Sequence, residues 1–367
     1  MFVAATVFAI SATATLLVQA TPLPNPDNGG VVRSVLATVA NIALLQQPSW
    51  GATCWGGYVP TCVAYYPDGN ALREYVLRSA GGTWEVGSTL NNAGTAIMPG
   101  SPIVAVNTRD MSKQTNGARR AQPAEHAVYF VSSDNKLRYF TNQAGWAISP
   151  TLLDIGALNT RARFMTVATR SNGDGPYYSI FWSDDSGSVH VWRKDAWGGG
   201  TDDGIIKGLT GHGPFTVSIS GKQSDPSATG RTLITADGQH WFTTEEVNND
   251  HWAASFPVPT LAGISGVTLP WNTAQQKFYG IGNSGKLTQA SLNTAARMFS
   301  PNDKIIDVFP RRDTPVTTVS TAYTAGGRNY INVFSVVSGK NTRHKIQSVV
   351  SSDDGNTWPV SVIAMKF

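Results

Sequence analysis

The sequence predicts an all-β protein, specifically a six-bladed β-propeller with four antiparallel strands in each blade. Three observations lead to this prediction. Short apolar segments recur about every fifty residues, each is followed by an aromatic segment and a tight turn, and the chain is rich in Gly and Pro. A repeat of this length is typical of propellers and of linear repeat arrays. An irregular pair of β-sandwiches is the alternative.

The first strand of each unit is predicted from small and β-branched residues, which fit the crowded centre of a propeller. An earlier copy at Val35–Val39 is a plausible first strand for the first unit. The other five copies are Ile103–Val106, Met165–Ala168, Phe215–Ser218, Val267–Leu269 and Thr317–Ser320.

The second and third strands of each unit are predicted on either side of a turn whose residues tolerate positive φ, such as Asp68-Gly69-Asn70. The second strands carry aromatic or bulky apolar residues and are expected at Val63–Tyr66, Ala127–Phe130, Ser179–Trp182, Thr232–Ile234, Lys277–Tyr279 and Ile331–Phe334. The third strands are expected at Leu72–Val76, Leu137–Thr141, Val189–Arg193, His240–Thr244, Lys286–Ala290 and Lys345–Val349. A fourth strand closes each unit, often opened by a Trp: Trp84, Trp146, Trp197, Trp252 or Trp358.

The N-terminal segment differs from the rest of the chain. Residues 1–20 are apolar and uncharged and end in Val18-Gln19-Ala20, which predicts a secretory signal peptide. An N-terminal membrane anchor is the alternative, although the apolar run is at the short limit for a membrane span. Residues 21–32 are predicted to form an extended, proline-containing leader, and residues 33–367 to form the propeller. We therefore expect a secreted protein without a membrane span in its body.

Secretion determines how the two cysteines are interpreted. Cys54 and Cys62 flank a short segment that contains Gly and Pro. In an oxidising compartment we expect them to form a disulfide across this loop. No His cluster accompanies them, so they do not predict a metal site.

The composition argues against several function classes. Lys and Arg number 28 and Asp and Glu number 24, for a net charge of +4, and the charges are scattered, whereas a nucleic-acid binder shows a basic stripe. The chain has no Gly-x-Ser-x-Gly motif. Gly280–Gly285 has the glycine spacing of a dinucleotide-binding loop, but it lies at a predicted hairpin turn and opens no helix, so it does not predict such a site. The predicted first strands offer no carboxylate for a calcium site. We expect no cofactor, no metal and no nucleic-acid partner, and the oligomeric state stays open.

One segment resembles a known family. The string Tyr65-Tyr66-Pro67-Asp68-Gly69-Asn70-Ala71-Leu72-Arg73-Glu74-Tyr75, followed by Gly82-Thr83-Trp84, is similar to a blade of the fungal fucose-specific lectins. Asp134–Tyr139 with Trp146 repeats the pattern. The resemblance implies a six-bladed propeller with sugar sites between blades. In that family an Arg at the start of the second strand, a Glu on the third strand and an aromatic residue of the next blade form each site.

The sugar-site positions are only partly kept. The family's Arg position corresponds to Val63, Ala127, Ser179, Arg231, Gln276 and Ile331, and its Glu position to Glu74, Tyr139, Val191, Trp241, Gln289 and Lys345. No unit keeps both residues. A buried site that lacks a charged hydrogen-bond partner loses roughly 1.5–3 kcal/mol for each such bond. We therefore expect weak or absent fucose binding, and a carbohydrate-binding lectin of altered specificity is the alternative function.

Two further patterns accompany these positions. A basic residue precedes the Glu position in five units, as Arg73, Arg138, His190, His240 and His344, and Thr288 precedes it in the remaining unit. These side chains either bond loop carbonyls or form a ring of donors around a pocket. Ser351–Trp358 fits the Asp-box of sialidase propellers, in which the box is a structural hairpin without catalytic meaning.

The leading functional expectation is an enzyme. In length, leader and lack of sugar-site residues, the chain resembles the propeller hetero-Diels–Alderases of fungal tropolone–sesquiterpenoid pathways. That resemblance implies a cofactor-independent enzyme with one apolar pocket, which joins a tropolone o-quinone methide to a humulene-type sesquiterpene. Such chemistry needs an acid near the leaving hydroxyl and a dry pocket that holds both partners in near-attack geometry.

The residues expected to form this pocket lie on loops that enter the first strands and near strand ends. The expected catalytic donors are Arg163, His212 and Arg311, of which His212 titrates nearest to neutral pH. The expected substrate-binding residues are Trp182, Trp271, Tyr66 and Arg161. The ligand would be a small aromatic or apolar molecule, or a glycan under the alternative function. Ordinary solvated loop charge is the other interpretation of the basic residues.

Overall fold

The computed structural model describes residues 50–366, with gaps in the connections between strands, the longest at 108–125, 307–316 and 221–229. Within the described residues the chain is almost entirely β-strand, and the strands form six sheets of four or five strands each. All of their pairings are antiparallel. The predicted signal peptide, leader and strand Val35–Val39 lie outside the described residues.

Each sheet is made from one continuous stretch of chain, and we number the sheets in chain order. Sheet 1 contains β1 (Gly51–Trp55), β2 (Thr61–Asp68), β3 (Ala71–Leu77) and β4 (Glu85–Leu90). Sheet 2 contains β5 (Val104–Asn107), β6 (His126–Val131), β7 (Lys136–Asn142), β8 (Trp146–Ile148) and β9 (Leu153–Asp154). Sheet 3 contains β10 (Phe164–Asn172), β11 (Gly175–Ser183), β12 (Ser188–Lys194) and β13 (Gly200–Thr210).

The second half of the chain repeats this order. Sheet 4 contains β14 (Thr216–Ser220), β15 (Gly230–Ala236), β16 (Trp241–Val247), β17 (His251–Trp252) and β18 (Phe256–Pro257). Sheet 5 contains β19 (Ala262–Leu269), β20 (Asn272–Ile281), β21 (Leu287–Asn293), β22 (Met298–Phe299) and β23 (Lys304–Ile306). Sheet 6 contains β24 (Thr317–Ala325), β25 (Arg328–Ser338), β26 (His344–Ser351) and β27 (Ile363–Lys366).

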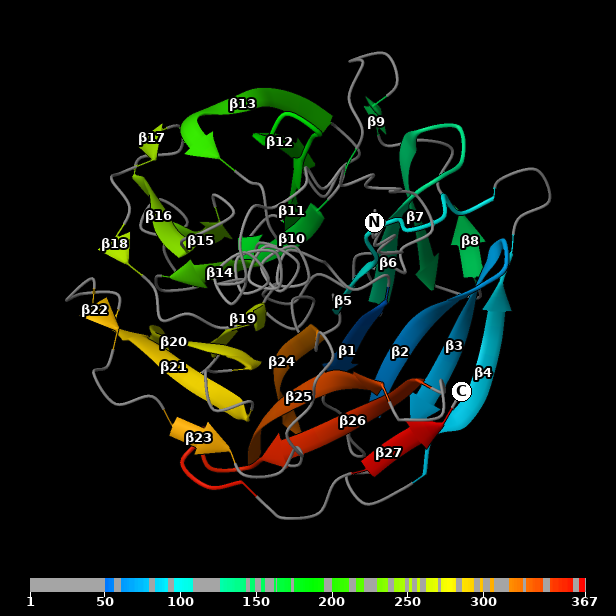
Figure 1. Ribbon diagram of the computed structural model, residues 1–367, viewed down its shortest axis with the longest axis vertical. Helices are drawn as coiled ribbons and strands as arrows, with labels where there is room; N and C mark the ends of the chain where they lie inside the picture. Colours follow the sequence, from blue (N-terminus) through cyan, green and yellow to red (C-terminus); the bar gives the residue numbers. More distant parts are fainter. Residues whose placement is uncertain are drawn as a thin grey trace, which may run out of the picture.

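The sheets are arranged around a common centre, with the first strand of each sheet innermost and the later strands further out (Figure 1). Each first strand contacts the first strand of the next sheet, and β24 of sheet 6 contacts β1 of sheet 1. Because every sheet is one piece of chain, no strand is shared between sheets 1 and 6. Among the described residues, the two end sheets therefore meet through contacts between side chains and not through a shared strand.

The core of the molecule lies between neighbouring sheets. The second strands of sheets 1 and 2 are buried on both faces, so they appear in the sequence as apolar runs without alternation. All six residues of β6 are buried, as are Cys62–Tyr65 of β2. Each sheet thus has one face toward the preceding sheet and one toward the following sheet.

The sequence prediction of an all-β chain made of antiparallel units is confirmed, whereas four strands per unit holds for sheets 1, 3 and 6 and a short fifth strand is present in sheets 2, 4 and 5. The first strand of the first unit differs, because the innermost strand of sheet 1 is β1 and not Val35–Val39. Gly51 of β1 lies so close to sheet 2 that a Cβ there would come within 2.9 Å of Ala105 N. The close approach requires glycine, and a glycine at this point obscures the β-branched pattern that identified the other first strands.

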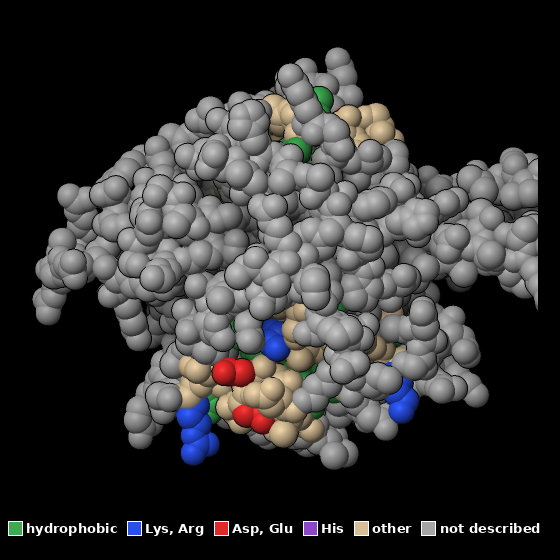
Figure 2. Space-filling model, turned by 90° about the vertical axis from the view of Figure 1, so that its left-hand side faces the viewer, with side chains coloured by type: hydrophobic (Ala, Val, Ile, Leu, Met, Phe, Trp, Pro, Cys, Tyr) green, Lys and Arg blue, Asp and Glu red, His purple; other side chains and the backbone are tan. Residues whose placement is uncertain are grey.

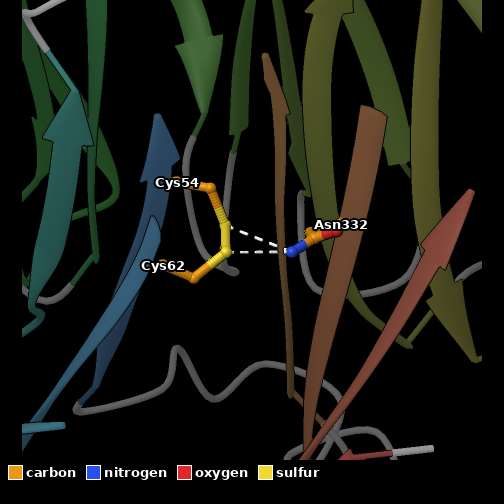
Figure 3. Close-up of a disulfide and its surroundings, with 3 residues drawn as sticks. All are labelled: Cys54, Cys62 and Asn332. Atoms are coloured by element: carbon orange, nitrogen blue, oxygen red, sulfur yellow. Dashed lines mark hydrogen bonds between the residues drawn. A yellow bond between two sulfur atoms is a disulfide. The ribbon is translucent and has the colours of Figure 1, made fainter. Parts of the chain in front are cut away.

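A disulfide between Cys54 and Cys62 confirms the predicted bridge. The two cysteines face each other across the β1–β2 pair, so the bridge joins adjacent strands of one sheet. Asn332 of β25 donates from Nδ2 to both sulfur atoms, at 3.2 Å from Cys54 Sγ and 3.0 Å from Cys62 Sγ (Figure 3). The buried disulfide therefore lies at the contact between sheets 1 and 6, where no strand crosses.

Removal of this disulfide should weaken the contact between the two end sheets. We expect the double variant Cys54→Ala/Cys62→Ala to lose about 2–3 kcal/mol of unfolding free energy, the usual effect of a bridge over a short loop. Urea denaturation of the variant and of the non-reduced wild type measures the difference. Equal midpoints, or two free thiols in the non-reduced wild-type protein, would contradict the assignment.

Candidate functional site

Three residues in each sheet define the groove toward the next sheet. In sheet 1, Tyr65 of β2 lies directly opposite Glu74 of β3, and Val63 is two residues before Tyr65. Side chains two apart on a strand, and those directly opposite on the neighbouring strand, share one face of a sheet. Val63 and Tyr65 pack there against residues of sheet 2. We call these three places the groove positions.

The same register identifies the groove positions of sheets 5 and 6. In sheet 5, Tyr279 is opposite Gln289, and Lys277 is two residues before Tyr279. In sheet 6 they are Asn332, Phe334 and Ser348, since Phe334 is opposite Ser348 and packs with sheet 1.

This register corrects the sequence alignment. The residue equivalent to Val63 of sheet 1 is Lys277 instead of Gln276 in sheet 5 and Asn332 instead of Ile331 in sheet 6. Lys345, assigned to the Glu position of sheet 6, lies opposite Val337 near the turn. The turn between the second and third strands differs in length from unit to unit, so a count from the turn loses the register. The Tyr at the middle groove position of sheets 1 and 5 is the signal that would have given the correct register.

The contact between sheets 5 and 6, which we call the groove between these sheets, combines buried polar groups with an aromatic ring: Tyr279, Gln289 and Lys277 are 0%, 5% and 8% exposed. Tyr279 donates its hydroxyl to Gln289 Oε1 at 3.2 Å, and Lys277 Nζ donates to Ser291 Oγ at 3.0 Å. Trp358 of sheet 6 meets Tyr279 edge to face, with ring centroids 5.7 Å apart. Complete burial raises the pKa of Tyr279 well above its usual value, so its hydroxyl stays protonated and remains a donor.

The Asp-box turn holds Trp358 in this groove. Asp353 accepts hydrogen bonds from the backbone N and the hydroxyl of Thr357, and Ser351 Oγ accepts from Gly355 N. Burial alone raises the pKa of Asp353, but its hydrogen bonds to Thr357 and Ser351 outweigh this and lower it. The turn is therefore the structural hairpin that the sequence pattern implied.

Gly355 places that turn directly against Gln289. It adopts a φ of 77°, and a Cβ there would lie 2.5 Å from Gln289 Oε1. Only glycine combines this backbone conformation with so close an approach. Sheet 6 thus contributes both the cover and the aromatic wall of the groove. From the sequence, Trp358 was expected only to open a fourth strand.

The groove between sheets 1 and 2 is filled by its own residues. The buried Glu74 carboxylate accepts hydrogen bonds from Tyr65 OH at 3.1 Å and from Ser88 N at 3.2 Å. His126 of sheet 2 lies 3.7 Å away and stacks on Trp55, with ring centroids 4.7 Å apart. Glu74 matches the family's Glu in sequence, yet here it binds the protein itself.

The groove between sheets 6 and 1 is also occupied. The disulfide lies against Asn332, and Trp84 of sheet 1 meets Phe334 edge to face at 5.9 Å. Trp84 therefore has the same place here as Trp358 has in the groove between sheets 5 and 6. Phe334, at the position where sheets 1 and 5 have a tyrosine, has no hydroxyl group.

The basic residues that precede the Glu position pair with acids of the adjacent turn. Arg73 binds Asp68 at 2.7 Å, Arg138 binds Asp134 at 2.9 Å, and His190 binds Asp184 at 2.9 Å. Burial raises the pKa of Asp184, but hydrogen bonds from His190, Ser186 and Ser188 lower it further than burial raises it. Arg73, Arg138 and His190 therefore stabilise hairpins, which corrects both interpretations considered from the sequence for these three residues; His240 and the side chain of His344 lie outside what the structure describes.

Two of the residues expected to bind substrate can be located. Trp182 is completely buried between sheets 2 and 3 and stacks on His190, with ring centroids 5.0 Å apart, so it is a core residue and lines no open pocket. Tyr66 is half-buried on β2 and packs against the core between sheets 1 and 6. The other expected site residues lie outside the described residues: Arg161, Arg163, His212, Trp271 and Arg311.

Comparison with known proteins finds a similar fold among solved structures but no match in sequence. No protein-family model matches the chain. No curated protein matches it in sequence. The fungal lectin of Aleuria aurantia, a six-bladed β-propeller with a fucose recognition mode, is 16% identical with a TM-score of 0.59, over 86% of this chain and 95% of that lectin. The chain resembles the six-bladed propeller lectins in fold.

Two further solved structures show the same likeness. AofleA of Arthrobotrys oligospora is 11% identical with a TM-score of 0.62, over 89% of this chain and 88% of that protein. The BP39L lectin of Burkholderia pseudomallei is 16% identical with a TM-score of 0.54, over 87% of this chain and 99% of that lectin.

These structures overturn the expectation of an enzyme. The proteins described as lectins among them bind carbohydrate, and the likeness to hetero-Diels–Alderases finds no support. The burial of Trp182 also removes one wall of the pocket that the enzyme required. The resemblance to fungal fucose-specific lectins is the one that the structure supports.

The charged side chains of the described residues are scattered. On the face shown in Figure 2, their Lys, Arg, Asp and Glu side chains lie singly, with both signs present. No group of three metal-ligating side chains occurs among these residues. Nor does the described part of the chain include a helix that is long and apolar enough to cross a membrane.

Glu74 should act in stability and not in ligand binding. Glu74→Gln keeps an oxygen for the Tyr65 hydroxyl but loses the charged acceptor for Ser88 N, at a cost of about 1–3 kcal/mol. Glu85→Gln is the matched control, because Glu85 is exposed and its contact with Arg78 is a surface ion pair of little energetic value. Urea denaturation of both variants measures the effect. Unchanged stability of Glu74→Gln would show that this carboxylate is not a structural element.

Proposed function

We propose that the protein is a carbohydrate-binding lectin built on a closed six-bladed β-propeller, with its main site in the groove between sheets 5 and 6. The ring of contacts among the six first strands supports the closed propeller. The observation that carries the site is the set Lys277, Tyr279, Gln289 and Trp358, which places polar donors beside an indole ring.

The chemistry of this groove suits a sugar. A sugar ring has apolar C–H faces and a rim of hydroxyls, so it needs an aromatic surface and hydrogen-bond partners at its edge. Trp358 offers the surface. The amide of Gln289 offers a partner that differs from the Arg and Glu of the fucose-specific family, so the specificity differs as well.

The proposed valency is low among the grooves whose side chains are described, a set that leaves out sheet 4 with Arg231. The grooves after sheets 1 and 6 are filled by a Glu–His contact and by a disulfide. In sheets 2 and 3, the groove positions are Ala127, Tyr129, Tyr139 and Ser179, Phe181, Val191. Tyr129 and Tyr139 stack on each other, with ring centroids 5.3 Å apart. This groove therefore has an aromatic surface that is not suited to recognise a sugar.

Removal of the Trp358 indole should abolish sugar binding while the fold persists. We expect Trp358→Ala to weaken binding of the best methyl glycoside at least about tenfold, as loss of a central aromatic contact usually does. Titration calorimetry with a panel of methyl fucoside, galactoside, glucoside and glucuronide measures affinity and stoichiometry.

The matched control is Trp84→Ala, which removes the equivalent indole from the groove between sheets 6 and 1. This variant should bind sugar as the wild type does. The proposal fails if Trp84→Ala loses binding and Trp358→Ala does not. Several equivalent micromolar sites would equally contradict it, because they would require grooves that the structure fills.

We also propose that the protein is secreted, with cleavage after Ala20. The apolar, uncharged residues 1–20 and the disulfide support this, since disulfides persist in oxidising compartments. N-terminal sequencing of protein from the culture medium of a eukaryotic host should begin at Thr21. Retention in the cell membrane with Met1 still present would favour the anchor.

A further inference from the structure

The groove between sheets 5 and 6 is covered in this structure. Tyr279 and Gln289 are 0% and 5% exposed, so a sugar reaches their polar groups only if the residues above them move. The cover belongs to sheet 6. Gly355, in the turn between β26 and β27, lies so near that a Cβ there would come within 2.5 Å of Gln289 Oε1 and 3.5 Å of Tyr279 OH. We call residues 352–357 of this turn the strap.

The strap is held in shape by hydrogen bonds between its own residues. The backbone N of Thr357 donates to Asp353 Oδ1 at 2.8 Å, and the backbone N of Asn356 donates to Asp353 O at 3.1 Å. Both partners of each bond lie within the strap. It can therefore move as one body and keep these bonds, as loops that cover active sites do.

The Ser351 hydroxyl ties the strap to the end of β26. It donates to Asp353 Oδ1 at 2.7 Å and accepts from Gly355 N at 3.0 Å. Ser351 itself is the last residue of β26 and pairs with Ile331 of β25. The hydroxyl thus links a paired strand to the strap, and loss of its two bonds would release the strap.

The strap touches Gln289 through a residue without a side chain. Gly355 is buried, whereas Ser352, Asn356 and Thr357 of the strap are exposed. Because no side chain at position 355 enters the groove, the strap can lift from Gln289 without withdrawing a packed group.

The groove between sheets 1 and 2 has a different cover. Gly87 comes as near to Glu74 as Gly355 does to Gln289, since a Cβ at Gly87 would lie 2.5 Å from Glu74 Oε1. Gly87, however, lies within β4, and residues on both sides of it, Val86 and Thr89, pair with β3. Removal of this cover would separate two strands of one sheet. The cover of the first groove is therefore fixed, whereas the strap lies outside the strand pairing.

We propose that the strap opens and closes the groove between sheets 5 and 6, and that the Ser351 hydroxyl holds it closed. This inference rests on the proposed carbohydrate-binding function for its purpose, but the movement is measurable without a ligand. A sugar binds the open state and shifts the population toward it. The apparent affinity for sugar is therefore lowered by the fraction of molecules that are closed, and release of the strap raises it.

A single introduced thiol measures the opening. Both native cysteines form the disulfide, so Gln289→Cys places the protein's one reactive thiol beneath the strap. Val63→Cys is the matched control, because Val63 is 2% exposed at a groove position with a fixed cover. In the folded protein we expect iodoacetamide to alkylate Gln289→Cys at least about tenfold faster than Val63→Cys, since local opening costs less free energy than global unfolding.

Two serine variants assign the opening to the strap. On the Gln289→Cys background, Ser351→Ala removes both bonds to the strap and should raise the alkylation rate about tenfold. Ser348→Ala is the control and should leave the rate unchanged, because this buried hydroxyl of the same strand has no hydrogen-bond partner among the described residues. Thermal unfolding checks that each variant is folded.

A second measurement needs no introduced cysteine. Trp358 Nε1 is buried, and no described residue accepts its hydrogen, so the exchange of this hydrogen with D₂O reports access to the groove. NMR spectra of the wild type and of Ser351→Ala, with the indole signal assigned by Trp358→Phe, should show faster exchange in the serine variant. This measurement decides the test if Gln289→Cys does not fold.

The outcomes separate this inference from the broader function. Alkylation of Gln289→Cys no faster than that of Val63→Cys, or equal acceleration by Ser351→Ala and Ser348→Ala, would overturn the strap and leave the lectin function standing. Tighter sugar binding by Ser351→Ala than by the wild type supports the strap's role in ligand entry, and unchanged affinity together with faster alkylation would overturn that role. Opening without binding of any sugar would overturn the proposed function and, with it, the purpose assigned to the strap.

Discussion

The rest of the structure depends on face-to-face packing of neighbouring sheets. Because each central strand is buried on both faces, every side chain that points toward the next sheet must either complete a core or form a site. The tyrosine at the middle groove position shows how this is achieved. Its ring joins the core, as Tyr65 does beside sheet 2 and Tyr279 beside sheet 6, and its hydroxyl binds the residue opposite on the third strand. The hydrogen bond fixes that opposite side chain at the groove, so its identity decides what the groove does.

Because the same three groove positions recur from sheet to sheet, the grooves differ through the residues at these positions. In sheet 1 the opposite residue is Glu74, and His126 from the next sheet closes the space beside it. In sheet 6 a phenylalanine removes the hydroxyl, and Asn332 turns to the disulfide of sheet 1 (Figure 3). Sheet 5 keeps the tyrosine at this position, as Tyr279, together with Lys277 and Gln289. The indole of Trp358, which lies beside them, comes from sheet 6 and has an N–H without a partner. The stabilising contacts of the first two grooves and the ligand-binding character proposed for the third thus arise from the same three positions.

The sequence predicted the fold much better than the site. Strand order, turns and the disulfide followed from local signals, such as Asp68-Gly69-Asn70 between two aromatic-rich strands, because these depend on residues near one another in the chain. The first strand was misplaced where a close contact with Ala105 requires Gly51, since a contact between sheets leaves no local pattern. Lys277 and Asn332 were missed because groove positions depend on cross-strand register, and turns of unequal length shift it. Trp182 resembled an exposed binding residue in sequence, but stacking of sheet 3 on sheet 2 buries it completely.

The most direct test is to locate a bound sugar. A crystal structure of the protein soaked with the methyl glycoside that binds most tightly would show every occupied groove at once. We predict density for the sugar ring on Trp358, with polar atoms within hydrogen-bond distance of Lys277 and Gln289, and none between sheets 1 and 2 beside Glu74. Sugar bound beside Glu74 with the groove between sheets 5 and 6 empty would contradict the proposal that the groove positions of sheet 1 stabilise the fold while those of sheet 5 bind the ligand.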